Sequence, residues 1–398
     1  MTKLDTISFD DALSLALESA QRSDRSEVVM LSQTLGRIVA EEIICKKNLP
    51  SFDNSAMDGF AFKHEDVGSR VRVASTIFAG DKPTEILQKG ECYKIMTGAQ
   101  VPSDADTIVP IENCLEVSSE SVQLPTDTKK GSSLRKKGEE QRVGATLIEV
   151  GERLTSAHIA MLSAQGIVAL SVYTKLDIAV VSTGDEIREP WESSSEDEIY
   201  NANAFGITAL LAEHGFDSSY LGSIPDDIDA TVSFIESLKS YDVIITTGGI
   251  SMGDADFLYD AFMSNGLKKL FHGVNVKPGR PTMMGQMGST FVMAMPGNPL
   301  TTMLNIRLLS IPILRKLQGY KNTDDIHIYA KNSKAFRISP SKSNMILGSL
   351  IDGRFVVTRD NRYGSGMLTP LMESNAVALL PQGRGEVELN ETIEVVML

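Results

Sequence analysis

The chain has few cysteines, few histidines and no excess of basic residues, and each shortage excludes a class of protein. Among its 398 residues are three cysteines and five histidines. Cys45, Cys92 and Cys114 lie far apart, without a CxxC motif or a Cys/His cluster, so we expect structural thiols in a reducing compartment and no zinc site. The histidines have no metal-ligand spacing and a GxSxG motif is missing, which argues against nucleophilic catalysis by the protein.

The net charge of -14 argues against a general nucleic-acid-binding protein, because such a protein needs a basic surface that neutralises phosphates. Any anionic ligand must therefore be attracted by local positive charge. No segment approaches the ~20 consecutive apolar residues of a membrane-spanning helix, and the first residues lack the basic start and apolar run of a signal peptide. We expect a cytoplasmic protein.

The order of predicted elements indicates a multidomain α/β protein. Residue 8 has the features of a helix N-cap, and short β-like runs follow at 71–74, 91–95 and 117–124. Residues 176–319 alternate strand and helix, which predicts a parallel sheet covered on both faces, with strands at 177–182, 218–222, 243–246 and 290–294. After residue 320 the pattern returns to β-like runs.

These patterns predict four domains. An N-terminal domain of helical and extended segments covers residues 1–50 and 141–175, and a small β domain is inserted into it at 51–140. A doubly wound α/β domain covers 176–320, and a C-terminal β domain covers 321–398.

Residues 53–59, DNSAMDG, concentrate two carboxylates, an amide and a hydroxyl just before an apolar run. Such groups are costly to bury without partners. Two interpretations are open for this segment alone. It is a solvated turn, since turns prefer these residue types, or a loop whose carboxylates coordinate a hard cation or position water.

Three predicted strands of the α/β domain end in unusual turns, at 182–186, 246–251 and 295–299. In a parallel sheet all three turns leave from the carboxyl edge, where ligands bind in doubly wound folds. Glycines there let backbone N–H groups approach an anion, and the following helices present their positive ends. The turns therefore predict a site for a phosphate-bearing ligand.

Carboxylates crowd the same edge and would repel a phosphate unless a divalent cation lay between them, so we expect a phosphate bridged by Mg²⁺. They are Asp185, Glu186, Asp226, Asp227, Asp254 and Asp256. Positive charge comes from Lys277 and Arg280 in KPGRP (277–281), where two prolines restrict the backbone that carries both cations. Residues 135–140, RKKGEE, are either a solvated charge run or a second part of the anion site.

Together, seven motifs resemble those of the molybdopterin molybdenumtransferase family, which is similar to the E domain of gephyrin. The resemblance runs nearly end to end and rests, in the family's order, on DNSAMDG (53–59), IMTGA (95–99), GEE (138–140), STGDE (182–186), GGISMGDAD (248–256), KPGRP (277–281) and PGNP (296–299).

The resemblance implies an elongated four-domain subunit and a homodimer whose active site joins the α/β domain of one subunit to the inserted β domain of the other. The implied substrates are an adenylylated dithiolene pterin, adenylylated molybdopterin, and molybdate. The phosphoanhydride is hydrolysed with the help of Mg²⁺, AMP leaves, and the two sulfurs bind molybdenum, which gives the molybdenum cofactor.

The resemblance also implies a role for each matching residue. The metal and the attacking water are assigned to Asp58, Glu186, Asp226 and Asp256, of which Glu186, Asp256 and Asp58 are the expected metal ligands. Thr97 helps to hold the ligand, and Glu140 is a further catalytic candidate. The residues expected to bind the pterin nucleotide or the oxyanion are Gly184, Asp185, Gly248, Gly249, Ser251, Lys277, Arg280, Pro296, Pro299, Arg337 and Ser365.

The chain departs from the family pattern at three positions. Glu140 stands where Asp is usual, which keeps the charge but lengthens its reach. Arg280 replaces a common Lys and Thr301 a common Ser, and because Arg presents a planar fork where Lys presents a point charge, the geometry of oxyanion binding changes while the charge stays.

Two other functions are open. One is a non-catalytic scaffold of the gephyrin kind, against which the intact acidic motifs argue. The other is the molybdopterin adenylyltransferase reaction that precedes molybdenum insertion. Expected partners are the second subunit, the adenylyltransferase that supplies the substrate, and acceptor molybdoenzymes, with no nucleic acid and no membrane.

Overall fold

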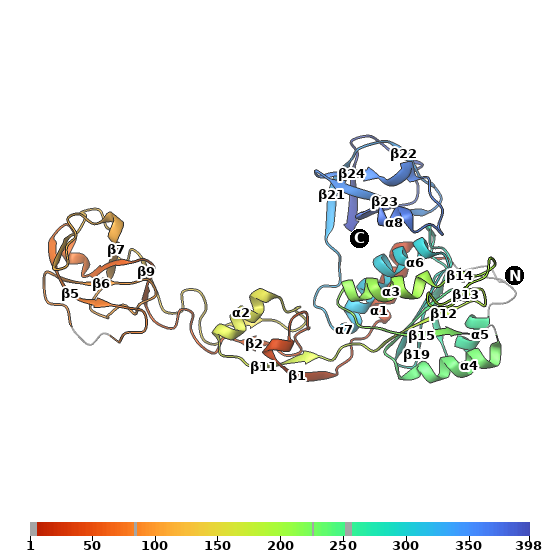
Figure 1. Ribbon diagram of the computed structural model, residues 1–398, viewed down its shortest axis with the longest axis horizontal. Coiled ribbons are helices and arrows are strands. Elements are labelled where there is room, and N and C mark those ends of the chain that lie inside the picture. The colour runs from red at the N-terminus through yellow and green to blue at the C-terminus, as the bar shows by residue number, and fades with distance from the viewer. Residues whose placement is uncertain (1–5, 83–85, 225–226, 251–256) are drawn as a thin grey trace. The chain divides into compact units, whose positions relative to one another are not determined.

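The computed structural model describes residues 6–82, 86–224, 227–250 and 257–398. The chain divides into two compact units (Figure 1). Unit 1 contains Met1–Ala40, Val150–Thr155 and Ala169–Leu398, and unit 2 contains Glu41–Glu149 and Ser156–Val168. Each unit is therefore assembled from segments that are separate in the sequence.

Unit 2 is built on a mixed five-stranded sheet with the order β7-β4-β6-β5-β8. The interior strand β4 (Gly59–Phe62), between β7 and β6, is buried along its whole length, because its alternate side chains enter two apolar clusters. Ala61 packs in one cluster, and Phe60 and Phe62 pack in the other. The other elements of unit 2 are β2 (Ile43–Ile44), β3 (Asn54–Ser55), β5 (Arg70–Ile77), β6 (Glu91–Ile95), β7 (Thr107–Pro110), β8 (Ser121–Gln123), β9 (Leu134–Arg135), β10 (Thr146–Ile148) and α2 (Ser156–Ala164).

The α/β part of unit 1 contains a six-stranded sheet with the order β15-β12-β16-β20-β19-β17. The first four strands are parallel neighbours, as the sequence predicts. The sheet is nevertheless mixed, because β19 runs antiparallel to both β20 and β17. The strands are β12 (Ile178–Thr183), β15 (Ser219–Ile224), β16 (Val243–Thr247), β17 (Lys268–His272), β19 (Met283–Met287) and β20 (Thr290–Met295).

The sequence pattern did not reveal β17 and β19. Met283, Met284 and Met287 in β19 are all buried, so the strand lacks the alternation of a half-exposed strand. The turn from β19 into β20 contains Gly288, whose φ of 64° is easily adopted by glycine.

Helices cover both faces of the parallel strands (Figure 1). Alternate side chains point to opposite faces, so that Val180 and Ile245 pack with α1, α3, α6 and α7, whereas Val181 and Ile244 pack with α4 and α5. The predicted N-cap is confirmed, since the Ser8 hydroxyl accepts the N–H of Asp11. The helices are α1 (Phe9–Ser19), α3 (Ala202–Glu213), α4 (Ile228–Ser237), α5 (Phe257–Ser264), α6 (Pro299–Asn305) and α7 (Ile311–Gln318).

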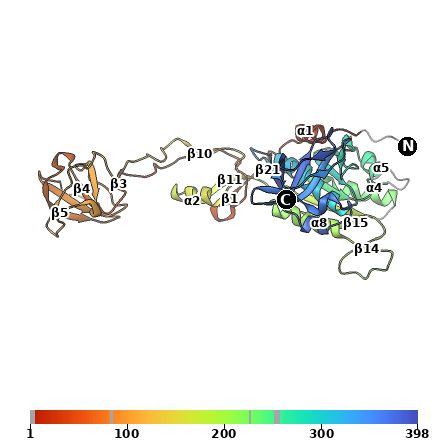
Figure 2. The same ribbon diagram turned by 90° about the horizontal axis from the view of Figure 1, so that it is seen from above.

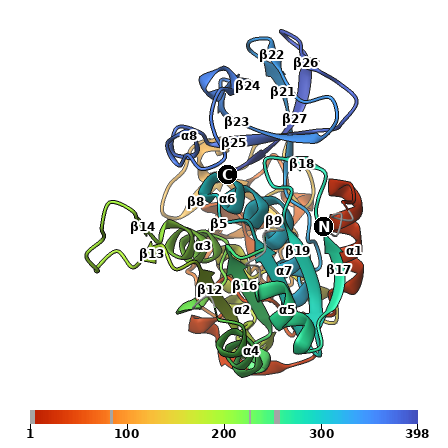
Figure 3. The ribbon, with the colours of Figure 1, turned by 90° about the vertical axis from the view of Figure 1, so that its right-hand side faces the viewer.

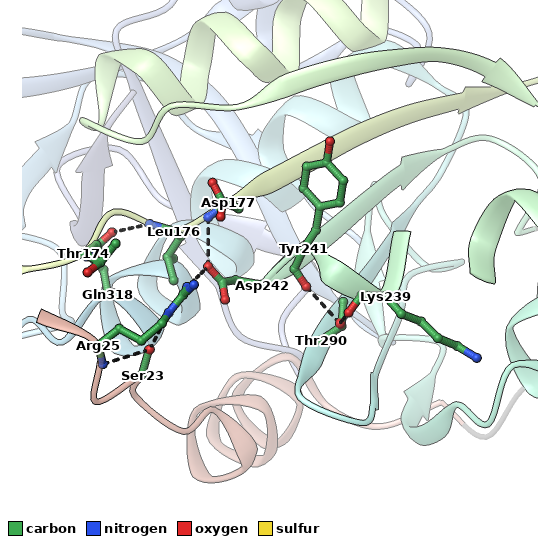
Figure 4. Close-up of polar contacts among 10 residues, drawn as sticks. All are labelled: Ser23, Arg25, Thr174, Leu176, Asp177, Lys239, Tyr241, Asp242, Thr290 and Gln318. Atoms are coloured by element: carbon green, nitrogen blue, oxygen red, sulfur yellow. Dashed lines mark hydrogen bonds and ion pairs between the residues drawn. The ribbon is translucent and has the colours of Figure 1, made fainter. Parts of the chain in front are cut away.

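Polar contacts fix the amino ends of the central strands (Figure 4). Asp242, just before β16, pairs with Arg25 and accepts the N–H of Asp177 at 2.9 Å. Gln318 at the end of α7 accepts the N–H of Leu176 at 3.0 Å, and Thr290 donates to the carbonyl of Tyr241 at 2.9 Å. Parallel pairing of β16 with both β12 and β20 then brings the carboxyl ends of the three strands side by side.

The C-terminal part of unit 1 is a β-barrel, which Figure 3 shows beyond one end of the α/β sheet. Its strands follow the order β23-β24-β21-β27-β25, and pairing of β25 with β23 closes the circle. Its elements are β21 (His327–Asn332), β22 (Phe336–Arg337), β23 (Ser343–Ile351), β24 (Arg354–Val357), α8 (Thr369–Met372), β25 (Ala376–Leu380), β26 (Glu386–Val387) and β27 (Thr392–Met397).

One short strand joins the barrel to the α/β part. β18 (Val276–Lys277) belongs to the α/β part by sequence but pairs with β23 of the barrel. The remaining strands of unit 1 are β1 (Ser26–Met30), which pairs with β11 (Ala169–Tyr173), and β13 (Ile187–Arg188), which pairs with β14 (Ile199–Tyr200). No helix in the described ranges is long and apolar enough to cross a membrane.

Candidate functional site

The structure brings the three unusual turns together at the carboxyl edge of the α/β sheet. They line one cavity of about 520 Å³, here called the sheet-edge cavity. The residues predicted to bind a ligand that do line it are Gly184, Glu186, Gly248, Gly249, Pro296 and Pro299. Asp185, which is exposed, is not among the lining residues.

The glycines of these turns are required for close packing of one turn on another. A Cβ atom at Gly248 or Gly249 would lie 2.8 or 2.6 Å from the hydroxyl oxygen of Thr183. A Cβ atom at Gly184, whose φ is 131°, would lie 2.6 Å from Oε2 of Glu186. From the sequence, these glycines were expected to let an anion approach the backbone. In the structure they let the turns pack closely on one another and on the Glu186 carboxylate.

Two asparagines at the start of α3 line the same cavity, and neither was predicted from the sequence. Asn201 is the N-cap and accepts the N–H of Ala204 at 3.1 Å. Asn203 donates to Thr247 Oγ1 at 2.7 Å and to the carbonyl of Gly297 at 2.8 Å, and so ties two of the turns together. The helix that starts here directs its free N–H groups toward the cavity, a favourable arrangement for an anion.

A second cavity, of about 350 Å³, lies between the α/β part and the barrel. It is here called the cationic cavity, because Lys277, Arg280 and Lys342 line it and none of its described lining residues is acidic. In a chain with a net charge of -14 this is a local reversal of sign. Pro281, Pro296 and Asn298 line both cavities, which therefore adjoin.

The short pairing of β18 with β23 brings the cationic side chains together. Lys277 stands opposite Asn344, two residues after Lys342, so that cations from the α/β part and from the barrel meet. Lys342 was not predicted, because a lone lysine in a β region carries no signal of its own. The Thr301 hydroxyl is buried at the cavity wall and has no hydrogen-bond partner among the described residues. An oxyanion could accept from it.

Of the two barrel residues predicted to reach the oxyanion, only Ser365 lines the cationic cavity. Arg337 is exposed and is not among the lining residues, but its carbonyl accepts from Nδ2 of Asn361 at 3.0 Å, and Asn361 does line the cavity. Arg359, Asp360 and Asn361 all have positive φ, of 47°, 54° and 59°. Such backbone costs ~1–2 kcal/mol per residue and is held here by ion pairs of Arg359 with Glu373 and of Asp360 with Lys334.

The three predicted metal ligands fall in different parts of the chain. Glu186 is exposed at the sheet-edge cavity, Asp256 lies outside the described residues, and Asp58 belongs to unit 2. Asp226 and Ser251 also lie outside them. The described residues contain no cluster of three or more His, Cys, Asp or Glu side chains that could hold a metal ion.

In unit 2, some polar side chains of the DNSAMDG segment are buried and others are exposed. Asn54 and Ser55 are buried, whereas Asp58 and Thr97 are exposed. Asp58 Oδ1 accepts from the hydroxyl of Thr97 at 2.7 Å and from its N–H at 2.6 Å, and these bonds lower the pKa of Asp58. The carboxylate is therefore ionised and held in one orientation.

Asp53 has a different environment from Asp58. It accepts the N–H of Lys137 at 2.7 Å, which lowers its pKa, and it pairs with Lys136 Nζ at 3.1 Å. The RKKGEE run thus holds the acidic segment in shape. Glu140 is exposed, and its N–H donates to the carbonyl of Leu49.

Three family descriptions match consecutive parts of the chain. The MoeA N-terminal region (domain I and II) matches residues 7–166, the probable molybdopterin binding domain matches 179–316, and the MoeA C-terminal region (domain IV) matches 329–398. Together they account for both units.

Relatives and solved structures match the chain nearly end to end. It is 30% identical over 98% of both chains to a molybdopterin molybdenumtransferase of Haemophilus influenzae, and 29% identical to one of Bacillus subtilis over 95% of this chain and 91% of that one. The crystal structure of a molybdopterin biosynthesis MoeA protein from Pyrococcus horikosii has a TM-score of 0.79 at 28% identity, and covers 99% of each chain. The chain belongs to the molybdopterin molybdenumtransferase family.

Proposed function

We propose that this protein inserts molybdenum from molybdate into adenylylated molybdopterin, with Mg²⁺-dependent hydrolysis of the phosphoanhydride and release of AMP. The observation that carries the proposal is the pair of adjoining cavities in unit 1, one cationic and free of acids among its described lining residues, the other built from turns that suit a phosphate. Family membership and the printed names of the relatives support it.

The cationic cavity is the proposed molybdate site. Molybdate is a compact dianion, and fixed cations with hydroxyl and amide donors recognise such an ion. Lys277, Arg280 and Lys342 supply the charge, and Thr301 and Ser365 supply hydroxyl groups. The adjoining wall at Pro296 lets this ion lie close to a ligand in the sheet-edge cavity.

The sheet-edge cavity is the proposed site of the pterin nucleotide. The start of α3, which lines the cavity from Asn201 to Asn203, would present N–H groups to the phosphates. The donor chemistry fits Mg²⁺, which prefers hard oxygen ligands, and Glu186 would hold it together with Asp256. When bound, Mg²⁺ neutralises phosphate charge. We also assign to Glu186, a carboxylate at the cavity wall, the orientation of the water that attacks the phosphorus on the pterin side, so that the bridging P–O bond breaks and AMP departs with the bridging oxygen.

We further propose a cytoplasmic homodimer in which Asp58 and Thr97 of one subunit complete the site formed by unit 1 of the other. The bonds from Thr97 keep Asp58 ionised and oriented while it stays exposed, as a residue that meets a ligand requires. The cysteines are free, which suits the reducing cytoplasm in which a dithiol substrate keeps its thiols.

The direct test is the release of AMP from adenylylated molybdopterin by the purified wild-type protein, with and without molybdate and Mg²⁺. We expect release to require Mg²⁺ and to rise with molybdate, and the pterin product to carry molybdenum. Transfer of AMP from ATP to free molybdopterin would instead favour the adenylyltransferase reaction. Absence of both activities would favour the scaffold.

Replacing Lys277 by Met should raise the KM for molybdate about tenfold to a hundredfold, because a hydrogen bond to a charged group contributes about 1.5–3 kcal/mol. The measurement is the molybdate dependence of AMP release at saturating pterin nucleotide. Lys331→Met is the matched control, since Lys331 is exposed on β21 and lines neither cavity. An unchanged KM for molybdate in Lys277→Met would mean that molybdate does not bind in the cationic cavity.

A further inference from the structure

The sheet-edge cavity has an apolar side that the proposed chemistry does not use. Ile187, Ile199 and Tyr200 line it at β13 and β14, opposite in character to the glycine-rich turns. Ile199 is 59% exposed and Tyr200 is 50% exposed. Because successive side chains of a strand point to opposite faces, Ile199 and Tyr200 do not share one surface, and Tyr200 alone presents an accessible aromatic side chain at the cavity wall.

We propose that Tyr200 forms a platform on which a planar heteroaromatic ring of the pterin nucleotide stacks. The inference rests on the proposed function and adds a specificity-determining residue to it. The substrate carries two such rings, adenine and pterin, and the chemistry of stacking is common to both.

The backbone places this platform beside the reacting end of the cavity. The N–H of Ile199 donates to the carbonyl of Glu186 at 3.0 Å, and the N–H of Asn201 donates to the carbonyl of Arg188 at 2.8 Å. Tyr200 therefore follows directly on a residue bonded to Glu186. A ring on Tyr200 and a phosphate near Glu186 can belong to one bound molecule.

The platform stands at the base of an arm, residues 189–198, that projects from the sheet edge (Figures 2 and 3). An ion pair between Arg188 and Glu198 at 2.5 Å closes the arm. A polar network anchors it, because Asn201 Nδ2 donates to Tyr220 Oη at 2.7 Å and Tyr220 pairs with Glu189. Burial raises the pKa of Tyr220 beyond its usual range, so its hydroxyl stays a donor. The platform is thus held before a ligand arrives.

The other aromatic side chains near the arm already have aromatic partners. Trp191 packs edge-on against Phe205, with ring centroids 5.9 Å apart, and Phe205 packs against Tyr220 at 5.6 Å. Within the described part of the chain, Tyr200 has no ring contact of this kind. Its face is therefore available to a ring that none of the described residues supplies.

The test compares three probes by titration calorimetry on the full-length protein. AMP carries adenine, 6-hydroxymethylpterin monophosphate carries the pterin ring, and ribose 5-phosphate carries neither. Tyr200→Leu keeps apolar bulk without a ring, and Tyr200→Phe keeps the ring. The matched control is Tyr329→Leu, because Tyr329 is 71% exposed on β21 of the barrel and lines neither cavity.

We expect the wild type to bind at least one ring-bearing probe more tightly than ribose 5-phosphate. Tyr200→Leu should bind that probe with about tenfold lower affinity. Tyr200→Phe and Tyr329→Leu should bind it as the wild type does, and ribose 5-phosphate should be unaffected. If Tyr200→Leu loses affinity for AMP alone, the platform binds adenine. If it loses affinity for the pterin probe alone, the platform binds the pterin ring.

Three results would overturn the platform. They are a wild type that binds neither ring-bearing probe more tightly than ribose 5-phosphate, an unchanged affinity in Tyr200→Leu, and an equal loss for all three probes. If Tyr200→Leu kept its affinity for the probes but changed the oligomeric state of the protein, the platform would be overturned and Tyr200 would belong to a subunit contact. Failure here is distinguishable from failure of the proposed function, because molybdate-dependent AMP release by the wild type is measured without these variants.

Discussion

Replacing Glu186 by Gln should lower the rate of molybdate-dependent AMP release by a hundredfold or more, since positioned acid–base groups contribute about 10²–10⁴ in rate. Glu186 is the described carboxylate that lines the sheet-edge cavity, and Gln retains its size while it loses the charge needed to bind Mg²⁺ or to orient water. Affinity for AMP in the absence of Mg²⁺ should change little, because the N–H groups of the turns remain.

The measurement is single-turnover AMP release with enzyme in excess, which separates chemistry from product release. Glu196→Gln is the matched control, since Glu196 is exposed in the nearby arm at residues 189–198 and lines neither cavity. If Glu186→Gln retained half of the wild-type rate, Glu186 would have no part in the hydrolysis.

The same variant tests whether two subunits share the site. Asp58→Asn should be as inactive as Glu186→Gln, because the amide cannot supply the ionised carboxylate that Thr97 orients. When the two inactive variants are mixed and allowed to exchange subunits, half of the dimers are mixed and each contains one intact shared site. Activity should then recover to about a quarter of the wild type. No recovery would mean that each subunit carries its own site.

The parallel core of the sheet and the meeting of its three turns could be predicted from the sequence. Buried strands such as β16 appear as short apolar runs, and the carboxyl ends of neighbouring parallel strands necessarily meet at one edge. Gly184, Gly248 and Pro296 were therefore placed in one site by topology alone, and the structure does bring them together.

The cationic cavity could be predicted only in part. Lys277 and Arg280 stand out because prolines restrict the loop that carries them, whereas Lys342 and Asn361 come from the barrel. The connection between the two parts is the pairing of two residues of β18 with β23. A two-residue strand leaves no periodicity in the sequence, so no pattern could show which barrel residues face the loop.

The contributions of Arg337 and Asn201 to the cavities could not be predicted from the sequence either. The family resemblance implies that Arg337 binds the oxyanion, whereas Arg337 is not among the residues that line the cavity and its carbonyl accepts from Asn361, which is. Asn201 was not predicted as a site residue, yet it lines the sheet-edge cavity as well as capping α3. One side chain can serve both purposes, and capping is the one that a sequence reveals.

Replacing Asp325 by Ala should be strongly destabilising, by about 3–5 kcal/mol, because it would leave two arginines without their buried partner. Asp325 accepts from Arg307 at 2.7 Å and from Arg315 at 2.9 Å, and the side chains of Asp325 and Arg307 are only 8% and 6% exposed. Nearby His214 adds no further positive charge beside the two arginines, since burial lowers its pKa to about 4 and it is neutral at pH 7.

The destabilisation should also reach the cationic cavity. Asp325 lies between α7 and β21, and Arg307 also donates to the carbonyl of Met397 at 2.6 Å, so the pair holds the α/β part against the barrel. Since the cavity walls come from both parts, Asp325→Ala should raise the KM for molybdate as well as lower the urea midpoint of unit 1. Asp324→Ala, at an exposed neighbour, should do neither. A lower midpoint with an unchanged KM would mean that β18 alone aligns the cavity.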